Sequence, residues 1–211
     1  MDKERFKEYY KKKDVTTTYD SQRLGTEYRR NKREKELEIF LRFLDKEEED
    51  EILELGCSSG FLTKYLGKKV TAIDTSREML EIVRNKSPWA KCLVADMFEL
   101  PFRDKAFHKV ITMRVWTHLN ENDLRLVLNE SKRVLKPKGI VVFDIEEKNW
   151  IRKLVNFFYK RIFKITGFKI YQYSLKKIKI ILEEKGFTLE RVGYLKHRIG
   201  RQIILKIKKT K

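Results

Sequence analysis

The sequence is poor in residues that bind metals or form disulfide bridges. It contains only two cysteines, Cys57 and Cys92, so it offers no disulfide framework and too few thiols for a cysteine-rich zinc site. Its three histidines, His108, His118 and His197, are scattered along the chain. We therefore expect no bound metal, and a reducing, cytoplasmic compartment.

Long apolar stretches are also missing. No run of about 18 apolar residues occurs, so we expect no segment to span a membrane. The N-terminus lacks the apolar core of a secretory signal, and no repeat or low-complexity tract is present. A length of 211 residues suits one domain, or one domain with an appendage.

Positive charge is abundant and lies mainly near the C-terminus. The formal net charge is +18, and residues 148–211 hold 19 basic residues against 3 acidic ones, a net charge of +16. Such a region attracts polyanions: nucleic acid, anionic lipid or an acidic partner. The alternative is a solubilising, thermophile-like composition with 38% charged residues, which explains the amount of charge but not its one-sided distribution.

Short apolar segments alternate with amphipathic ones through the middle of the chain. The pattern predicts strands over 52–55, 69–74, 90–96, 106–113 and 140–145, helices over 26–44, 61–66 and 121–135, a helix through residue 83 capped by Thr75 or Ser76, and a turn at 136–139. Strands that alternate with helices indicate a parallel sheet covered on both faces. Ligands of such sheets bind beyond the carboxyl ends of the strands.

The last part of the chain follows a different pattern. Residues 149–166 predict an amphipathic helix with one apolar and one basic face. Ser174 is expected to cap a further helix, which Gly186 stops. Two final strands, 188–195 and 202–208, have no helix between them, so we expect them to form an antiparallel pair.

Residues 52–60 read Ile-Leu-Glu-Leu-Gly-Cys-Ser-Ser-Gly and predict a buried strand that runs into a tight glycine turn. Glycines at 56 and 60 leave room for a ligand, and the predicted helix start beyond them presents free backbone N–H groups. The turn therefore predicts a site for a nucleotide-like cofactor. Ordinary turn glycines are the alternative, which only the surrounding motifs can exclude.

Three such motifs follow the turn in order. The strand over 70–74 ends in an acidic residue. The strand over 90–96 ends in Val-Ala-Asp and is followed by Leu-Pro-Phe at 100–102, and residues 134–139 read Val-Leu-Lys-Pro-Lys-Gly. Together with the acidic residue and glycines of 54–60, they resemble the motifs of class I S-adenosylmethionine-dependent methyltransferases. The chain is most similar to the small enzymes grouped with the methyltransferases of ubiquinone and menaquinone biosynthesis.

The resemblance covers about residues 37–147 in register and implies a fold. The expected architecture is an α/β, Rossmann-like, seven-stranded and mostly parallel sheet, with helices on both faces and a C-terminal antiparallel strand pair. Residues 1–36 are expected to form a helical lid segment, and 37–211 the cofactor-binding methyltransferase domain. A basic aromatic cap is expected as an insertion at about 149–173.

The resemblance also implies S-adenosylmethionine as the cofactor and suggests roles for its contacts. The glycine turn would approach its amino-acid end, with Glu54 ordering the turn or meeting the ammonium group. Asp74 would accept from the ribose hydroxyls, and Asp96 from the adenine amine, with a neighbouring backbone N–H and apolar contact from Met97. The expected cofactor-binding residues are Tyr19, Arg23, Glu54, Gly56, Cys57, Ser58, Gly60, Asp74, Thr75, Met79, Asp96, Met97 and Arg114.

Some of these residues have alternative interpretations. Met79 is more often a core residue than a contact to adenine, and Arg114 would hold either an anionic acceptor or the cofactor carboxylate. Tyr19 and Arg23 resemble part of a lid, or lie in a solvated loop. Ser58 replaces the usual middle glycine of the turn; it fits if its φ is negative, and we expect binding to be retained.

No catalytic residue is assigned from the sequence. Trp116 would wall the acceptor pocket, and His118 would act as a base or serve the structure at a helix start. The aromatic and basic residues of the cap suit an apolar acceptor or an anionic membrane, but also RNA, or only solvent on the outer face.

We therefore expect a methyltransferase that acts on a small, hydrophobic or membrane-associated molecule, in the cytoplasm and peripherally at the membrane. An RNA methyltransferase that uses the basic C-terminal face is one alternative. The other is a non-catalytic, methyltransferase-like binding protein, against which the intact Asp74 and Asp96 argue.

Overall fold

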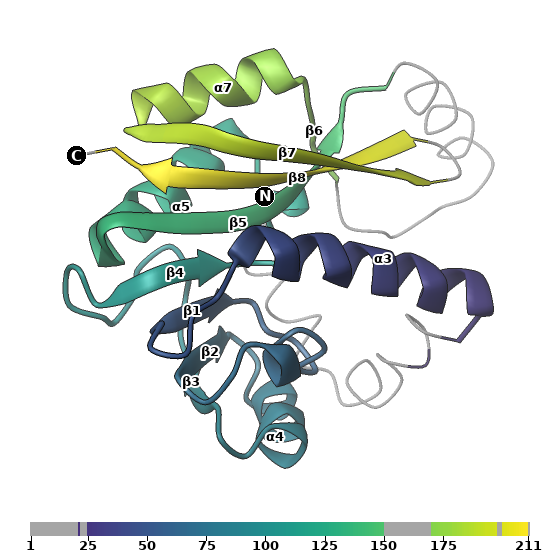
Figure 1. Cartoon of the computed structure of the whole chain (residues 1–211), viewed down its shortest axis with the longest axis vertical. Coiled ribbons are helices and arrows are strands. Elements are labelled where there is room, and N and C mark those ends of the chain that lie inside the picture. Colours follow the sequence, from purple (N-terminus) through teal and green to yellow (C-terminus); the bar gives the residue numbers. More distant parts are fainter. Residues whose placement is uncertain (1–20, 22–24, 150–169, 198–199, 211) are drawn as a thin grey trace.

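The computed structural model describes residue 21 and residues 25–149, 170–197 and 200–210, and these form a sheet covered by helices (Figure 1). The strand order is β3-β2-β1-β4-β5-β8-β7. The strands are β1 (Ile52–Leu55), β2 (Val70–Asp74), β3 (Lys91–Val94), β4 (Phe107–Ile111), β5 (Leu135–Glu147), β7 (Phe187–His197) and β8 (Gly200–Lys209). β1 to β5 pair in parallel, whereas β8 is antiparallel to both β5 and β7. The predicted mostly parallel sheet and its antiparallel end are thus confirmed.

An eighth strand, β6 (Gln172–Tyr173), adds to the sheet where β5 runs beyond β4. It pairs in parallel with Glu146 and Glu147. Two residues are too short for a periodic signal, and the sequence pattern therefore did not predict this strand. β6 lies at the end of the segment that was expected to form the cap.

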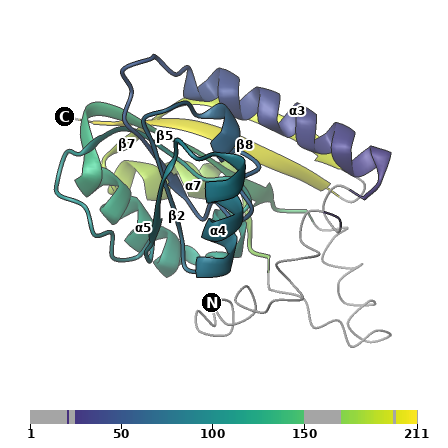
Figure 2. The ribbon, with the colours of Figure 1, turned by 90° about the horizontal axis from the view of Figure 1, so that it is seen from below.

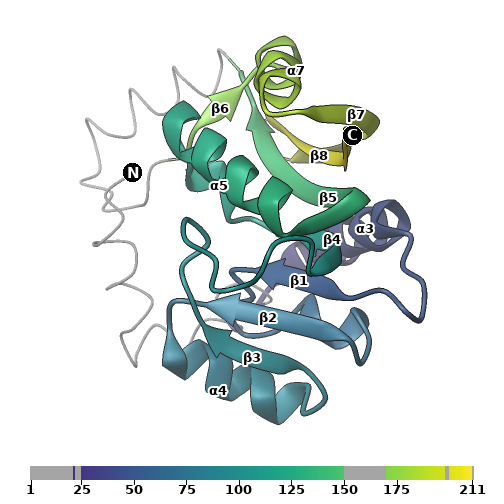
Figure 3. The same ribbon diagram turned by 90° about the vertical axis from the view of Figure 1, so that its left-hand side faces the viewer.

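Helices cover both faces of the sheet, as Figures 2 and 3 show from two directions. On one face, α5 (Glu121–Val134) and α7 (Leu175–Glu184) pack on a core that includes Val141, Phe143 and Leu205. On the other face, α3 (Glu27–Leu44) places Phe40 and Leu44 in a second core with Ile204. The neighbours Ile204 and Leu205 belong to different cores because successive side chains of a strand point to opposite faces of the sheet.

Polar caps set the starts of the helices, and those of α4 and α7 were predicted from the sequence. Thr26 accepts from the backbone N–H of Arg29 at the start of α3. Ser76, rather than Thr75, caps α4 (Arg77–Lys86). Ser174 caps α7, which ends before Gly186. Each cap satisfies a backbone donor that the first helical turn leaves unpaired.

Two local predictions were wrong. The helix expected over 61–66 is only a three-residue 3₁₀ turn, Thr63–Tyr65, because glycines with positive φ at 60 and 67 bound the segment on both sides. The turn expected at 136–139 lies inside β5, where Lys138 has a φ of 64° and the register against β4 shifts. A bulge therefore replaces the turn. The helix expected over 149–166 lies outside the described residues.

Candidate functional site

The glycine turn follows β1 directly and lies at the carboxyl edge of the parallel strands. Gly56 and Gly60 have φ values of 68° and 78°, which favour glycine. A methyl group on Gly56 would lie 2.6 Å from Val115 Cγ2, and one on Gly60 would lie 3.2 Å from Val83 Cγ2. Both positions therefore need glycine for their backbone conformation, and Gly56 needs it for space as well.

Ser58 does not have the negative φ that was expected of it. Its φ is 51°, in the left-handed region that non-glycine residues rarely adopt. The conformation directs its backbone N–H at Asp74, whose Oδ2 lies 2.9 Å away. A hydrogen bond to a carboxylate is stronger than one to a neutral acceptor, so it offsets part of the strain at this serine.

Asp74 ends β2 and organises the site through the backbone. Its Oδ2 accepts from Ser58 and its Oδ1 from the backbone N–H of Ser76, both at 2.9 Å. Burial raises the pKa of its carboxyl group, although hydrogen bonds from Ser76, Ser58 and Thr75 act in the opposite direction. Each carboxylate oxygen has a second lone pair, so two hydroxyl groups of a ligand could still donate to it.

Glu54 is buried within β1 beneath the turn. The hydroxyl of Thr63 donates to its Oε2 at 2.6 Å. Burial raises the pKa of Glu54 to about 8, and the nearby charge of Asp74 adds to this effect. The side chain is therefore mainly protonated at neutral pH. This arrangement fits the expected role of ordering the turn better than that of an ionised partner for an ammonium group.

The remaining residues that were expected to bind the cofactor differ in their burial. Asp96 is half-buried and its Oδ1 accepts from the backbone N–H of Phe98 at 3.0 Å, while Met97 packs at the edge of the core. Thr75 is half-buried, but Met79 and Cys57 are buried. The other two expected residues, Tyr19 and Arg23, lie outside the part of the chain that the structure describes.

Arg114 follows β4 and is already paired inside the protein. Its backbone has a φ of 61°, and its N–H donates to Asp144 Oδ1 at 2.6 Å. Its Nε lies 2.8 Å and 2.9 Å from the two carboxylate oxygens of Glu36. Helix α3 thus supplies a counter-ion to the residue that was expected to hold an anionic ligand.

Arg114 belongs to a buried polar group that the sequence analysis missed. We call it the Glu36 cluster; it contains Arg33, Glu36, Arg114, Asp144 and Gln202. Gln202 Nε2 donates to Asp144 Oδ2 at 2.8 Å and also to Glu36. One signal was visible in the sequence: Arg33 has the same helical spacing as the apolar face of 37–44, and Asp144 interrupts an apolar strand.

The two carboxyl groups of this cluster have opposite pKa shifts. Burial, together with the charge of Glu36, raises the pKa of Asp144 to about 7. Burial alone would raise the pKa of Glu36, but the charges of Arg114 and Arg33 outweigh it and lower that pKa. Glu36 is therefore the ionised partner of the arginines.

The segment after Arg114 forms a 3₁₀ turn, Trp116–His118. Trp116 is fully buried and packs on Phe143 with a ring-centroid distance of 4.6 Å, so it belongs to the core beneath the edge. His118 is half-buried.

Among the described residues, no group of three or more His, Cys, Asp or Glu side chains is arranged to hold a metal ion. None of the described helices has the length and apolar character needed to cross a bilayer.

Comparison with known proteins agrees with this geometry. Residues 53–143 match the family described as "Methyltransferase domain". An uncharacterized protein of Methanocaldococcus jannaschii is 33% identical over 160 residues, which cover 66% of this chain and 62% of that protein. A demethylmenaquinone methyltransferase of Chlorobaculum tepidum is 31% identical over 168 residues, which cover 72% of this chain and 69% of that enzyme.

A solved structure extends the similarity of fold to almost the whole chain. The magnesium protoporphyrin IX methyltransferase of Synechocystis PCC 6803, with bound SAH, superposes with a TM-score of 0.79 at 16% identity, covering 99% of this chain and 100% of that chain. The chain spans less than two thirds of several curated relatives, such as 55% of a Thermotoga maritima demethylmenaquinone methyltransferase. The matched motifs, the sheet and the Chlorobaculum relative together show that the chain belongs to the class I S-adenosylmethionine-dependent methyltransferases.

Proposed function

We propose that this protein transfers a methyl group from S-adenosylmethionine to a small, hydrophobic or membrane-associated acceptor. The choice of S-adenosylmethionine as methyl donor rests on the connection between the glycine turn and the end of β2. There Asp74 fixes Ser58 and Ser76 by backbone hydrogen bonds. This connection places the backbone of a tight turn next to a carboxylate, which suits a ligand with a polar amino-acid end and a ribose.

The residues at this edge fit the cofactor of the family. Gly56 and Gly60 give the turn its backbone conformation, and Asp74 retains acceptor capacity for the ribose hydroxyls. Asp96, at the next strand end, would accept from the adenine amine. The cofactor supplies an already activated methyl group, so the contribution of the protein is mainly to position the acceptor and exclude water.

The proposed acceptor class is supported by where the cap segment joins the sheet. Lys148 donates its backbone N–H to Tyr173 O at 2.9 Å, and Tyr171 donates to Thr117 O at 2.8 Å. The chain thus leaves and re-enters at the carboxyl edge, beside the segment that follows Arg114. The sequence between these points is rich in aromatic and basic residues, which suits an apolar molecule at an anionic surface.

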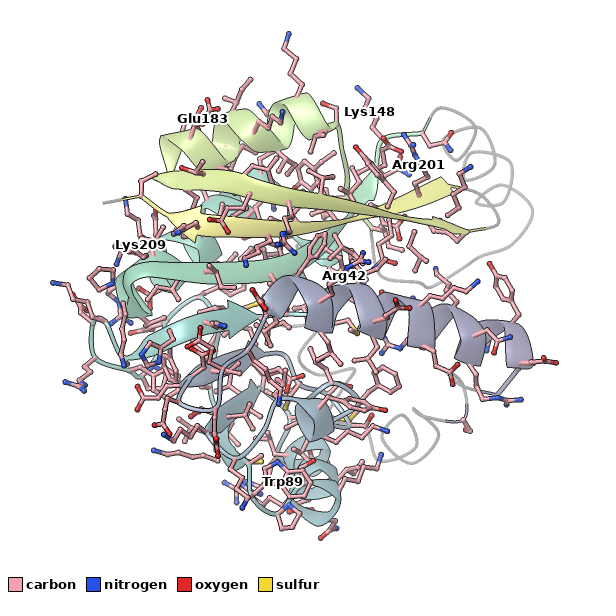
Figure 4. All side chains as sticks on the ribbon, viewed as in Figure 1. Arg42, Trp89, Lys148, Glu183, Arg201 and Lys209 are labelled. Atoms are coloured by element: carbon pink, nitrogen blue, oxygen red, sulfur yellow. The ribbon has the colours of Figure 1, made fainter. Side chains whose placement is uncertain are left out.

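Three basic side chains from the C-terminal region lie toward opposite ends of β8 (Figure 4). Figure 4 places Lys209 at one end of β8 and Arg201 with Lys148 at the other. Arg201 is also paired with Glu147, with N–O distances of 2.5 and 2.7 Å. An arginine paired with a carboxylate is less available to phosphate groups, which weighs against an RNA track at this end of β8.

Titration calorimetry with S-adenosylmethionine tests the first half of the proposal, since absence of binding at millimolar cofactor would refute it. Flotation with anionic liposomes and retention of RNA at increasing salt test the second half. We expect co-flotation with the liposomes and loss of RNA binding at moderate salt. Retention of RNA without flotation would instead favour an RNA methyltransferase.

A further inference from the structure

The Glu36 cluster lies next to residues that border the glycine turn. Val115, the neighbour of Arg114, is the residue that a side chain on Gly56 would strike. Arg33 lies over the ring of Phe61, directly after Gly60, with 4.6 Å between the guanidinium carbon and the ring centroid. The cluster therefore borders the part of the site that faces the amino-acid end of the cofactor.

Within the cluster, Arg114 is the more accessible cation. Its side chain is 28% exposed, whereas that of Arg33 is 9% exposed and that of Glu36 is fully buried. Glu36 carries a single negative charge and contacts both arginines. Asp144, whose pKa is raised to about 7, also acts on Arg114 and offsets part of the remaining positive charge at neutral pH. The guanidinium of Arg114 lies beside the residue next to the turn, where it would stabilise an anionic group of a ligand.

The position of Arg114 is determined from two directions. Asp144 holds its backbone N–H and so supports the left-handed conformation that aims the side chain. Glu36 accepts from Nε through both carboxylate oxygens and restricts the guanidinium, leaving its outer edge for another acceptor. A guanidinium restricted in this way loses less conformational entropy when it binds a second carboxylate.

We propose that Glu36 is a positioning residue for cofactor binding: it holds Arg114 so that the guanidinium receives the carboxylate at the amino-acid end of the cofactor. This inference rests on the proposed function. It gives helix α3 a part in recognising the cofactor, although Glu36 itself touches none of it.

The test compares two ligands that differ in the amino-acid end. S-adenosylhomocysteine carries the carboxylate, whereas 5′-methylthioadenosine keeps the adenosine and sulfur but lacks the amino acid. Calorimetry should show that Glu36→Gln weakens binding of S-adenosylhomocysteine by on the order of tenfold, the value of one charge-assisted hydrogen bond. Its affinity for 5′-methylthioadenosine should stay within about twofold of wild type, since that ligand makes no contact with Arg114.

Two further variants distinguish a role of Glu36 in positioning Arg114 from a general loss of folded protein. Glu38→Gln removes an exposed carboxylate from the same helix and should change neither affinity. Arg114→Lys keeps the charge but loses the planar fork, and should reproduce the selective loss if Glu36→Gln does not fold.

Each alternative result is informative. Equal losses for both ligands would mean a merely structural role, and would overturn the inference. Unchanged or tighter binding of S-adenosylhomocysteine by Glu36→Gln would also overturn the inference. It would mean that removing the negative charge helps the ligand at least as much as the altered position of Arg114 harms it. If the wild-type protein bound neither ligand, the proposed function would fail as well.

Discussion

The backbone N–H of Ser58 lies 2.9 Å from Oδ2 of Asp74, so the glycine turn and the end of β2 are joined by one hydrogen bond to a carboxylate. The same carboxylate caps the segment that enters α4 through Ser76. A single side chain thus orients two loops of the cofactor site. Its removal should affect binding more than folding.

Replacement of Asp74 by asparagine should weaken binding of S-adenosylmethionine by at least on the order of tenfold, because hydrogen bonds to a charged acceptor are lost. Calorimetry measures the affinity, and circular dichroism checks that the fold is intact. Glu81→Gln, an exposed change on α4, is the matched control. Wild-type affinity in the Asp74 variant would refute the proposed ribose contact.

Replacement of Ser58 by glycine should stabilise the protein by about 0.5–1 kcal/mol, since relief of the left-handed strain exceeds the entropy lost by glycine on folding. The N–H that bonds Asp74 is retained, so cofactor affinity should change little. Urea denaturation measures the free energy of unfolding. Ser59→Gly, at a buried neighbour without positive φ, should instead destabilise. A loss of stability in Ser58→Gly would show that the serine side chain matters more than its strain.

Glu54 should make the stability of the protein depend on pH. The unfolded chain releases this proton near the ordinary pKa of 4.5, whereas the folded chain keeps it up to about pH 8. The folded state therefore binds more protons in this window, and the free energy of unfolding should fall as pH rises through it. Glu54→Gln, a neutral and similarly shaped residue, should flatten this dependence.

Denaturation at pH 5, 7 and 8.5 measures the effect of Glu54. Glu54→Gln should be more stable than wild type at pH 8.5 and differ least at pH 5. Parallel curves for the two proteins would contradict the raised pKa. Thr63→Val provides a second check of the Glu54 pKa. Loss of the Thr63 hydroxyl removes the hydrogen bond that favours ionised Glu54, so the pKa of Glu54 should rise further.

Gly56→Ala should cost about 1–3 kcal/mol of stability, the usual penalty of overpacking, and should also abolish tight cofactor binding. The added methyl group would lie 2.6 Å from Val115 Cγ2. The double variant Gly56→Ala/Val115→Ala removes the clash but not the strain at φ 68°. It should recover part of the stability relative to Gly56→Ala. Thermal melts of both single variants and the double variant give the coupling; strict additivity would show that the two side chains do not meet.

The sequence predicted the parts of the site that are encoded locally. Gly56, Gly60 and Asp74 could be identified because the turn and the strand end lie in short continuous motifs. The conformation of Ser58 could not, since its φ is determined by Asp74, 16 residues further on. The helix expected after Gly60 was wrong for a related reason: the apolar spacing is helical, but the segment between two glycines is too short.

The Glu36 cluster was missed because its members are distant in sequence. Glu36 comes from α3, Asp144 from β5, Gln202 from β8 and Arg114 from the segment after β4, and the packing of α3 across β5 and β8 brings them together. No local pattern links a helical glutamate to an arginine 78 residues later. The contacts of the expected cofactor residues with the cofactor itself stay predictions.

The position of Gln202 has a consequence for folding during synthesis. Glu36 is made 166 residues before one of its partners, Gln202. Until β8 has left the ribosome, the carboxylates of Glu36 and Asp144 lack their shared amide donor, and α3 lacks the strand that buries Phe40 and Leu44 beside Ile204. Helix α3 also packs on β5, but its contacts with β8 form only after that strand has been made, so the docking of α3 and the polar cluster are completed together.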